Sequence, residues 1–363
     1  MTAATHADTR ARLRDIYAGA HEQTLHPNAL GWPGRPDERE LEFISRVVFD
    51  RPGMAREGCA YLVKELAQLA EIERHLSAVF GIITSQLGAD TSPISAGYDL
   101  HHALSCFAAE EYLHADFFYR YVRELAGEDV KLADSRFSER LALYQADDSP
   151  YVKLAAMCMA AYIGESVITV FEKRTAHLDP GREHFLTKLL WAHGMDEARH
   201  VQVDHVVLEH IMPSFSEAER RRAFEIFAGT EDHNFELAGR FKQLILDVFS
   251  VDHTVDNPAW DMQLRLTSAF RQAMTDTWPP SPVEERLDDE TRKLLRDFAG
   301  ADRVPRPPKQ GRDPALAGGI EWVHARPSPR DHNRGTTAWA PRPPAPATRR
   351  TRLPARWGGR PRP

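Results

Sequence analysis

The sequence has few of the features that mark disulfide-rich proteins and proteins with organic redox cofactors. Its 363 residues include only three cysteines, Cys59, Cys106 and Cys158, which are widely spaced and form no C-x-x-C pair. Cys106 and Cys158 lie in apolar stretches of helical character, which favours reduced thiols in the core over disulfides or a zinc site. The sequence contains no G-x-G-x-x-G motif for a flavin or nicotinamide and no cysteine-rich iron–sulfur motif.

Long apolar runs are missing as well. No stretch of ~18 uncharged apolar residues occurs, so we expect no membrane span. The N-terminal segment MTAATHADTRARLRDIYAGAHEQ has charged residues where a signal peptide would need its apolar region. These two absences predict a cytoplasmic protein.

Charge is distributed unevenly along the chain. Residues 301–363 carry 14 Lys and Arg, 4 Asp and Glu, and 13 of the 25 prolines, so their net charge is +10. Because the whole chain has a net charge of −7, residues 1–300 carry −17. Residues 303–363 are predicted to be disordered, since this composition cannot bury a core. This tail is either a dispensable extension or a contact for nucleic acid or acidic partners, but the acidic body argues against nucleic acid as the main ligand.

Apolar residues recur every three or four positions between about residues 8 and 277, which predicts helix throughout. No alternation of period two indicates a strand or hairpin. Ser216 and Glu219 have the spacing of a capping box and so mark the start of one helix. Long helices are predicted at 55–88, 97–126, 149–178, 182–212, 215–250 and 257–277.

Four helices of ~28–34 residues with short or medium connections predict an all-α protein built on a helical bundle. Residues 1–54 should form an N-terminal helical segment that packs on this bundle. Residues 55–278 should contain the bundle and its flanking C-terminal helices, and residues 279–302 a linker with a short helix.

One short pattern, an acid followed by Glu-x-x-His, occurs twice: EEYLH at 110–114 and DEARH at 196–200. Residues three apart share a helix face and lie about 4.5 Å apart along the axis, so each Glu and His can bind the same metal ion. A single Glu-x-x-His is weak evidence, but two copies on separate long helices favour a metal site between those helices.

Two further glutamates fall on apolar helix faces. Glu165 is the one charged residue in the segment 154–171, where a carboxylate must be protonated or meet a cation. Glu73 fills the vacant position of an apolar stripe, and its rivals Glu65 and Glu71 lie off that stripe. The residues of the stripe are Leu62, Leu66, Leu69, Leu76, Phe80 and Ile83.

On the predicted helix 182–212, His193, Glu197 and His200 point within about 60° of one another. Inward glutamates on four helices, two of them followed by His, are the arrangement of di-iron proteins with a ferritin-like four-helix bundle. Carboxylates with few imidazoles favour iron or manganese over structural zinc.

The acids that precede each pair point toward a neighbouring helix. Asp196 is predicted to orient His114, and Glu110 to orient His200, by accepting a hydrogen bond from the ring nitrogen that binds no metal. The alternative is that both acids lie at the surface.

Other residues near the ligands have two possible interpretations each. Thr169, one turn after Glu165, either assists oxygen chemistry or packs as an ordinary helix residue. Tyr162, one turn before Glu165, is either a radical tyrosine or part of the pocket or core. Five aromatic residues either line a pocket or belong to the core: Trp191, Phe107, Tyr112, Phe117 and Phe118.

With His193 included, the pattern resembles the p-aminobenzoate N-oxygenase family, the di-iron arylamine oxygenases of antibiotic biosynthesis. That family carries a Glu on the first bundle helix, Glu-x-x-His on the second, a lone Glu on the third and His-x3-Glu-x2-His on the fourth. The resemblance covers roughly residues 55–212, and His193 is its most discriminating feature, because a generic di-iron bundle uses six ligands. The matching positions are Glu73, Glu111, His114, Glu165, His193, Glu197 and His200.

The resemblance implies that two iron ions bind these residues and activate O₂ to oxidise a small organic substrate, often an aryl amine to hydroxylamine and nitro products. It also implies a separate electron donor and a homodimer. An iron-storage protein, a desaturase or a ribonucleotide reductase-like subunit would use the same ligands, but none of them requires His193. A purely structural bundle would leave the buried carboxylates unexplained.

Overall fold

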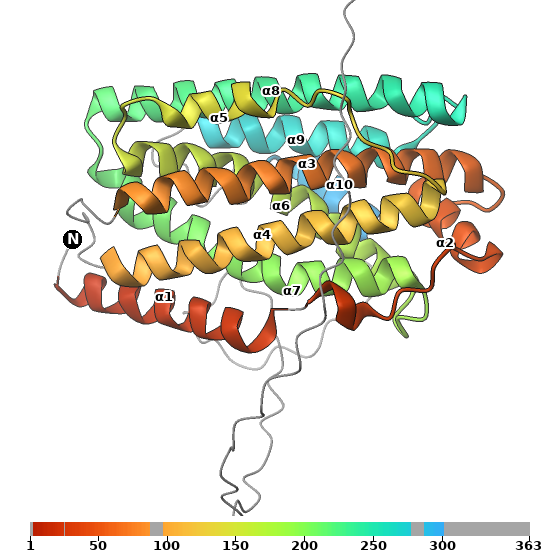
Figure 1. Ribbon diagram of the computed structural model, residues 1–363, viewed down its shortest axis with the longest axis horizontal. Helices are drawn as coiled ribbons and strands as arrows, with labels where there is room; N and C mark the ends of the chain where they lie inside the picture. Colours follow the sequence, from red (N-terminus) through yellow and green to blue (C-terminus); the bar gives the residue numbers. More distant parts are fainter. Residues whose placement is uncertain (1–2, 25, 88–96, 277–286, 301–363) are drawn as a thin grey trace, which may run out of the picture. The chain divides into compact units, whose positions relative to one another are not determined.

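The computed structural model describes residues 3–24, 26–87, 97–276 and 287–300, and these residues form helices and loops without any strand (Figure 1). The all-α prediction is therefore confirmed. The chain divides into two units, Met1–Arg306 and Pro307–Pro363, and every described residue belongs to the first. The predicted tail lies outside the described residues, as do residues 279–286 and 301–302 of the predicted linker and residues 277–278 at the end of the predicted bundle.

The bundle consists of four long helices, as a ferritin-like arrangement requires. Within it α3 packs against α4 and α6, and α7 packs against α4 and α6. Their bounds lie within a few residues of the predicted ones, except that the α-helical part of the fourth helix ends early and continues as a π-helix, η2 (Val207–Ile211), and a 3₁₀ turn, η3 (Met212–Ser214). The four helices are α3 (Ala55–Leu87), α4 (Gly97–Ala126), α6 (Pro150–Leu178) and α7 (Phe185–Val206).

Shorter and flanking helices cover the bundle. In Figure 1, α8 lies beyond α3 on one side, and α1 lies beside α4 and α7 on the other. Helix α2 contacts α3, and α5 contacts both α3 and α8. Helices α9 and α10 both contact α6. Their bounds are α1 (Ala3–Gln23), η1 (Pro27–Leu30), α2 (Glu38–Phe49), α5 (Phe137–Gln145), α8 (Glu217–Phe249), α9 (Pro258–Asp276) and α10 (Asp289–Ala299).

Local sequence signals fix several helix ends. The predicted capping box is present: the Glu219 backbone N–H donates to Ser216 Oγ (3.3 Å), and the Ser216 backbone N–H donates to Glu219 Oε2 (2.8 Å). Ser149 caps α6, and Pro150 occupies its first turn, where a missing N–H has no cost.

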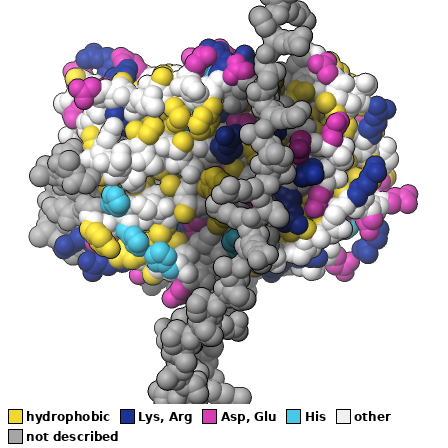
Figure 2. Space-filling model, viewed as in Figure 1, with side chains coloured by type: hydrophobic (Ala, Val, Ile, Leu, Met, Phe, Trp, Pro, Cys, Tyr) yellow, Lys and Arg dark blue, Asp and Glu magenta, His cyan; other side chains and the backbone are white. Residues whose placement is uncertain are grey.

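Helix α6 forms the centre of the core. By length and composition alone it could cross a membrane, but 78% of its most apolar 18-residue window is buried inside the protein. That burial is what a core helix of the bundle requires. Figure 2 shows Lys, Arg, Asp and Glu side chains spread over the surface of the molecule.

A buried glutamate from α2 fixes the start of α7. The backbone N–H groups of Phe185 and Leu186 donate to Glu40 Oε2 (2.9 Å) and Oε1 (2.8 Å), and the Tyr121 hydroxyl donates to Oε1 (2.8 Å). Amides in the first turn of a helix have no partner within it, and a carboxylate there also faces the positive end of the helix dipole. Glu40 therefore anchors the helix that carries His193, Glu197 and His200.

Replacing Glu40 should destabilise the protein. Glu40→Ala leaves two buried N–H groups and a buried hydroxyl without their acceptor, so we expect the free energy of unfolding in urea to fall by about 2–3 kcal/mol. Glu38→Ala, at an exposed position of the same helix, is the matched control and should cost less than about 1 kcal/mol. Equal losses in the two variants would show that Glu40 does not anchor α7.

Candidate metal centre

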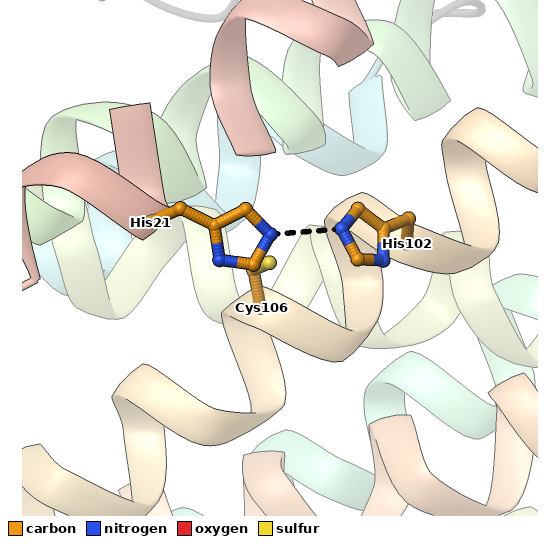
Figure 3. A group of neighbouring side chains, drawn as sticks. All are labelled: His21, His102 and Cys106. Carbon is orange, nitrogen blue, oxygen red and sulfur yellow. Dashed lines mark hydrogen bonds between the residues drawn. The ribbon is translucent and has the colours of Figure 1, made fainter. Parts of the chain in front are cut away.

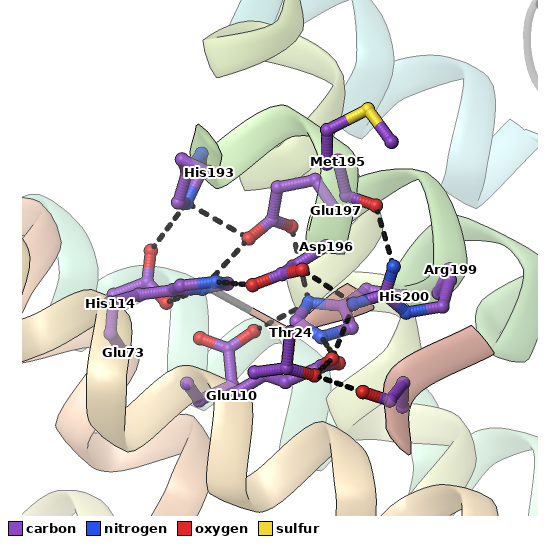
Figure 4. Close-up of polar contacts among 12 residues, drawn as sticks. Thr24, Glu73, Glu110, His114, His193, Met195, Asp196, Glu197, Arg199 and His200 are labelled. Carbon is purple, nitrogen blue, oxygen red and sulfur yellow. Dashed lines mark hydrogen bonds and ion pairs between the residues drawn. The ribbon is translucent and has the colours of Figure 1, made fainter. Parts of the chain in front are cut away.

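Six of the seven predicted ligand side chains meet inside the bundle. Each of the six is no more than 3% exposed. Figure 4 shows that the imidazoles of α4 and α7 and the carboxylates of Glu73 and Glu197 point toward one another. The six are Glu73 from α3, Glu111 and His114 from α4, and His193, Glu197 and His200 from α7.

The first group of potential ligand atoms joins three helices. Glu73, His114, His193 and Glu197 each offer an atom within 4.8 Å of the others. His193 Nε2 lies 2.9 Å from Glu197 Oε1 and 3.5 Å from Glu73 Oε1. His114 Nδ1 lies 3.1 Å from the same Glu197 oxygen and 3.6 Å from Glu73 Oε2.

The second group is adjacent and shares Glu197. It consists of Glu111, His114, Glu197 and His200, again with atoms within 4.8 Å of one another. His200 Nδ1 lies 2.9 Å from Glu111 Oε1 and 3.3 Å from Glu197 Oε2. Glu197 thus directs one oxygen toward each group, so it could contribute a ligand atom to both.

The donor set fits metal binding. Every one of the six side chains has a buried polar atom without a hydrogen-bond partner, and buried polar groups are otherwise almost always paired. Carboxylate oxygens and imidazole nitrogens are also suitable ligands for first-row divalent ions. The atoms are Glu73 Oε2, Glu111 Oε2, His114 Nδ1, His193 Nε2, both Glu197 oxygens and His200 Nδ1.

Electrostatics hold the cluster together as ion pairs. Burial and the charge of His193 oppose protonation of His114, but the neighbouring carboxylates of Asp196, Glu197 and Glu73 raise its pKa to about 10. Burial also opposes protonation of His193 and His200, yet the charge of Glu197 raises the pKa of both rings well above the usual value. Metal ions bind neutral imidazole, so an incoming ion must displace these protons.

Asp196 and Glu110 make the two predicted contacts with the histidines. Asp196 Oδ2 lies 3.1 Å from His114 Nε2, and Glu110 Oε2 lies 2.9 Å from His200 Nε2. Both acids are buried, which excludes the alternative that they lie at the surface. Contacts of this kind fix ring orientation and leave Nδ1 of each histidine free for a metal.

Arg199 is a buried residue beside the cluster that the sequence did not reveal. Its guanidinium donates to both Glu110 and Asp196 and is 6% exposed, so it compensates the charge of the two acids. Burial raises the pKa of Glu110, but hydrogen bonding and charge from His200, with the charge of Arg199, lower it to about 2. Arg199 directly precedes His200, and only the packing of α4 on α7 shows what it contacts.

Glu172 supports His193 and was also missed. Its Oε1 lies 3.0 Å from His193 Nδ1, so all three imidazoles have a carboxylate on the ring nitrogen that faces away from the cluster. Gly194 makes this approach possible, because a Cβ at that position would collide with the Glu172 carboxylate. The available signal was periodicity, since Glu172 lies two helical turns after Glu165.

Glu165, the seventh predicted ligand, is buried but belongs to neither group. Burial, then the charges of Asp204 and Glu197, raises its pKa well above the usual value. Burial likewise raises the pKa of Asp204. The two acids can coexist only if they share a proton or meet a cation. Asp204 continues the stripe of His193, Glu197 and His200 by one turn, and this extension was overlooked.

A cavity of about 160 Å³ lies against the cluster. Its metal side is formed by Glu73, Glu111, Glu165, His193 and Glu197, and most of its remaining wall is aliphatic. The aliphatic residues include Leu62, Leu66, Leu69, Ile72, Met157, Ile163, Val167 and Ile168.

The predicted aromatic residues do not line this cavity. Trp191 is 39% and Tyr112 66% exposed. Phe107, Phe117 and Phe118 instead pack on the ligand histidines; the Phe107 ring stacks on His200 at a centroid distance of 3.7 Å. Their role is to hold the imidazoles.

Thr169, Tyr162 and the two rivals of Glu73 all make contacts typical of helix packing or of ion pairs. The Thr169 hydroxyl donates to the Glu165 carbonyl (2.7 Å), a common helix contact. Tyr162 is fully buried against His205 and Phe270 and is not among the cavity residues. The rivals of Glu73 have other partners: Glu65 pairs with Lys64, and Glu71 pairs with Arg74.

Comparison with known proteins adds no assignment, because no protein-family model and no curated protein matches the chain. What indicates a metal centre is therefore the geometry and burial of its own side chains. Two adjoining groups with a shared carboxylate are compatible with a metal site.

Metal binding should depend on pH. Because the pKa of His114 is about 10, this ring is protonated at pH 7, and binding of Fe²⁺ must release the proton. We expect the affinity for Fe²⁺ to rise by about tenfold per pH unit for each proton displaced between pH 6 and 9. Anaerobic titration in weak buffer would measure the release; pH-independent binding would contradict it.

Gly194→Ala should weaken metal binding without unfolding the protein. The added methyl displaces the Glu172 carboxylate from His193 Nδ1, and loss of such a contact weakens metal affinity by ~10–100-fold. Gly81→Ala is the matched control, because a Cβ at this helical position meets nothing within 4 Å. Both variants should fold, since alanine favours helix over glycine by up to about 1 kcal/mol. Unchanged Fe²⁺ affinity in Gly194→Ala would rule out a role for Glu172.

Proposed function

We propose that the protein is a non-haem di-iron oxygenase that uses O₂ to oxidise a small organic substrate, most specifically an aryl amine at nitrogen. The observation that carries this proposal is the juxtaposition of two buried Glu and His groups with a largely apolar cavity. Two bound iron ions would supply the O₂-activating redox chemistry, and the protein would position them beside a dry pocket.

The charges of the donor set suit two divalent ions. Glu73, His114 and His193 would hold one ion with Glu197 Oε1, and Glu111 and His200 the other with Glu197 Oε2. Glu165 reaches the same cavity and brings the carboxylates to four, which balance the charge of two divalent ions. The three imidazoles add nitrogen donors without charge. Oxygen-rich ligation without thiolate favours iron or manganese.

The size of the cavity supports an aromatic substrate. Its volume of about 160 Å³ is close to that of an apolar cavity of ~150 Å³ that accepts benzene. A single ring would therefore fit among aliphatic lining residues such as Leu62, Leu66 and Ile168, in the cavity that Glu165 also lines. Such apolar walls favour an apolar ring over water.

Storage of iron is the main alternative, because it would use the same ligands. The largely apolar cavity beside the cluster favours oxidation of a bound molecule, since storage of iron requires no pocket for an organic substrate. The position of Tyr162, away from the cavity lining, gives no support to a radical-transferring subunit.

His193→Ala tests the proposal. The other ligands should retain most of the iron, whereas oxidation of an arylamine panel with O₂ and a reductant should fall by at least about tenfold, because one ion loses a nitrogen donor. His205→Ala, on the same helix but outside both groups, is the matched control and should keep both properties. Iron content and hydroxylamine or nitro products are measured in all three proteins.

Three outcomes would contradict the proposal. Elemental analysis could find about one zinc and no iron after anaerobic loading with Fe²⁺. The iron-loaded protein could consume O₂ only to accumulate ferric iron, as a storage protein would. Normal turnover in His193→Ala would make this residue a core histidine and remove its support for N-oxygenation.

A further inference from the structure

A second cluster of metal-binding side chains lies at the surface, where α1 crosses α4 (Figure 3). His21 comes from α1, and His102 and Cys106 come from α4. The two Nε2 atoms are 2.9 Å apart, and the ring nitrogens and Cys106 Sγ lie within 4.8 Å of one another. Histidine side chains also gather over α4 and α1 on the face shown in Figure 2.

Cys106 differs here from the sequence-based prediction. It was expected in the core, but it is only partly buried and its thiol faces His21. His102 and Cys106 are four residues apart, so they lie on one face of α4 and can bind the same ion. The third donor then comes from a separate helix, a combination that sequence spacing alone does not reveal.

The chemistry of this donor set differs from that of the buried centre. Two imidazoles and one thiolate are preferred by zinc and related borderline ions, whereas the buried centre is rich in carboxylates. With Zn–N distances of 2.0–2.1 Å, two nitrogens on a tetrahedral ion lie about 3.3 Å apart. The present distance of 2.9 Å joins two hydrogen-bonded nitrogens, which would move apart by a few tenths of an ångström as both rings turn toward the ion.

We propose that His21, His102 and Cys106 form a zinc site, with water as the fourth ligand. His21 is exposed, so the open position faces solvent and the ion can exchange. The Tyr17 ring packs edge-on against His102 at a centroid distance of 4.5 Å and holds the imidazole in place. The argument for this site does not rest on the proposed oxygenase activity.

A zinc ion here would clamp α1 onto α4 near the buried centre. Thr24, three residues after His21, donates a hydrogen bond to Glu110, which lies one turn after Cys106. The other oxygen of Glu110 holds His200. A bound ion would therefore fix the C-terminal end of α1 and, with it, the following residue Thr24. Thr24 contacts Glu110, which in turn contacts His200 of the buried centre.

Co²⁺ added to the iron-loaded full-length protein tests the site. The two buried groups contain no sulfur, so thiolate-to-Co²⁺ charge-transfer absorption reports the surface site alone. We expect one such Co²⁺ per chain, which Zn²⁺ displaces. Cys106→Ser should abolish the absorption, and His21→Ala, at an exposed position that cannot disturb the core, should weaken Co²⁺ binding by at least about tenfold.

Two matched controls separate this site from other thiols and imidazoles. Cys158→Ala removes a buried thiol near Glu165 and should leave the absorption unchanged. His101→Ala removes the imidazole next to His102 and should have no effect. Zn²⁺ should also raise the melting temperature of the parent protein but not that of Cys106→Ser, with equal iron content in both.

Several results would overturn the zinc site. These are absence of sulfur-to-Co²⁺ absorption in the parent protein, its persistence in Cys106→Ser, and its loss in Cys158→Ala. Unchanged Co²⁺ affinity in His21→Ala would remove α1 from the site. Failure of the oxygenase proposal would appear as missing iron or missing amine oxidation, neither of which alters the Co²⁺ spectrum.

Discussion

The interaction on which the centre depends is that of the Glu197 carboxylate with three buried imidazoles. Its two oxygens lie 2.9–3.3 Å from nitrogens of His193, His114 and His200. Burial raises the pKa of Glu197, but the charges of His193 and His200 lower it well below the usual value, so the carboxylate stays ionised in the core. A charge in this position is tolerated only because its counter-charges are equally buried.

Carboxylates on the surrounding helices stabilise the buried charges of the three imidazoles from outside the cluster. Each imidazole has one nitrogen toward Glu197 and the other toward a carboxylate: Asp196, Glu110 or Glu172. Arg199 then joins Asp196 to Glu110 and so connects α7 with α4. Ring orientation is thereby set by the protein itself, which lowers the reorganisation needed when ions bind.

The two candidate metal sites differ in the way their donors are held. The buried donors are fixed by packing of aromatic rings and by hydrogen bonds, as the stacking of Phe107 on His200 illustrates. The surface donors are held only where α1 meets α4, and His21 is exposed. A rigid, oxygen-rich centre beside a cavity suits the proposed reaction with a bound substrate, whereas an open site with a thiolate suits the proposed exchangeable ion that links two helices.

The helices, the capping box at Ser216 and six side chains that meet in the bundle could be predicted from the sequence, because the 3.6-residue period and the cost of buried charge are both local properties. It could not place Glu165 outside the two groups, turn Cys106 toward α1, or reveal the contacts of Arg199 and Glu172. It also left open whether Trp191 and Tyr112 line a pocket, and both are exposed. These features depend on the rotation of each helix about its axis and on which neighbour it meets, and only tertiary packing decides those.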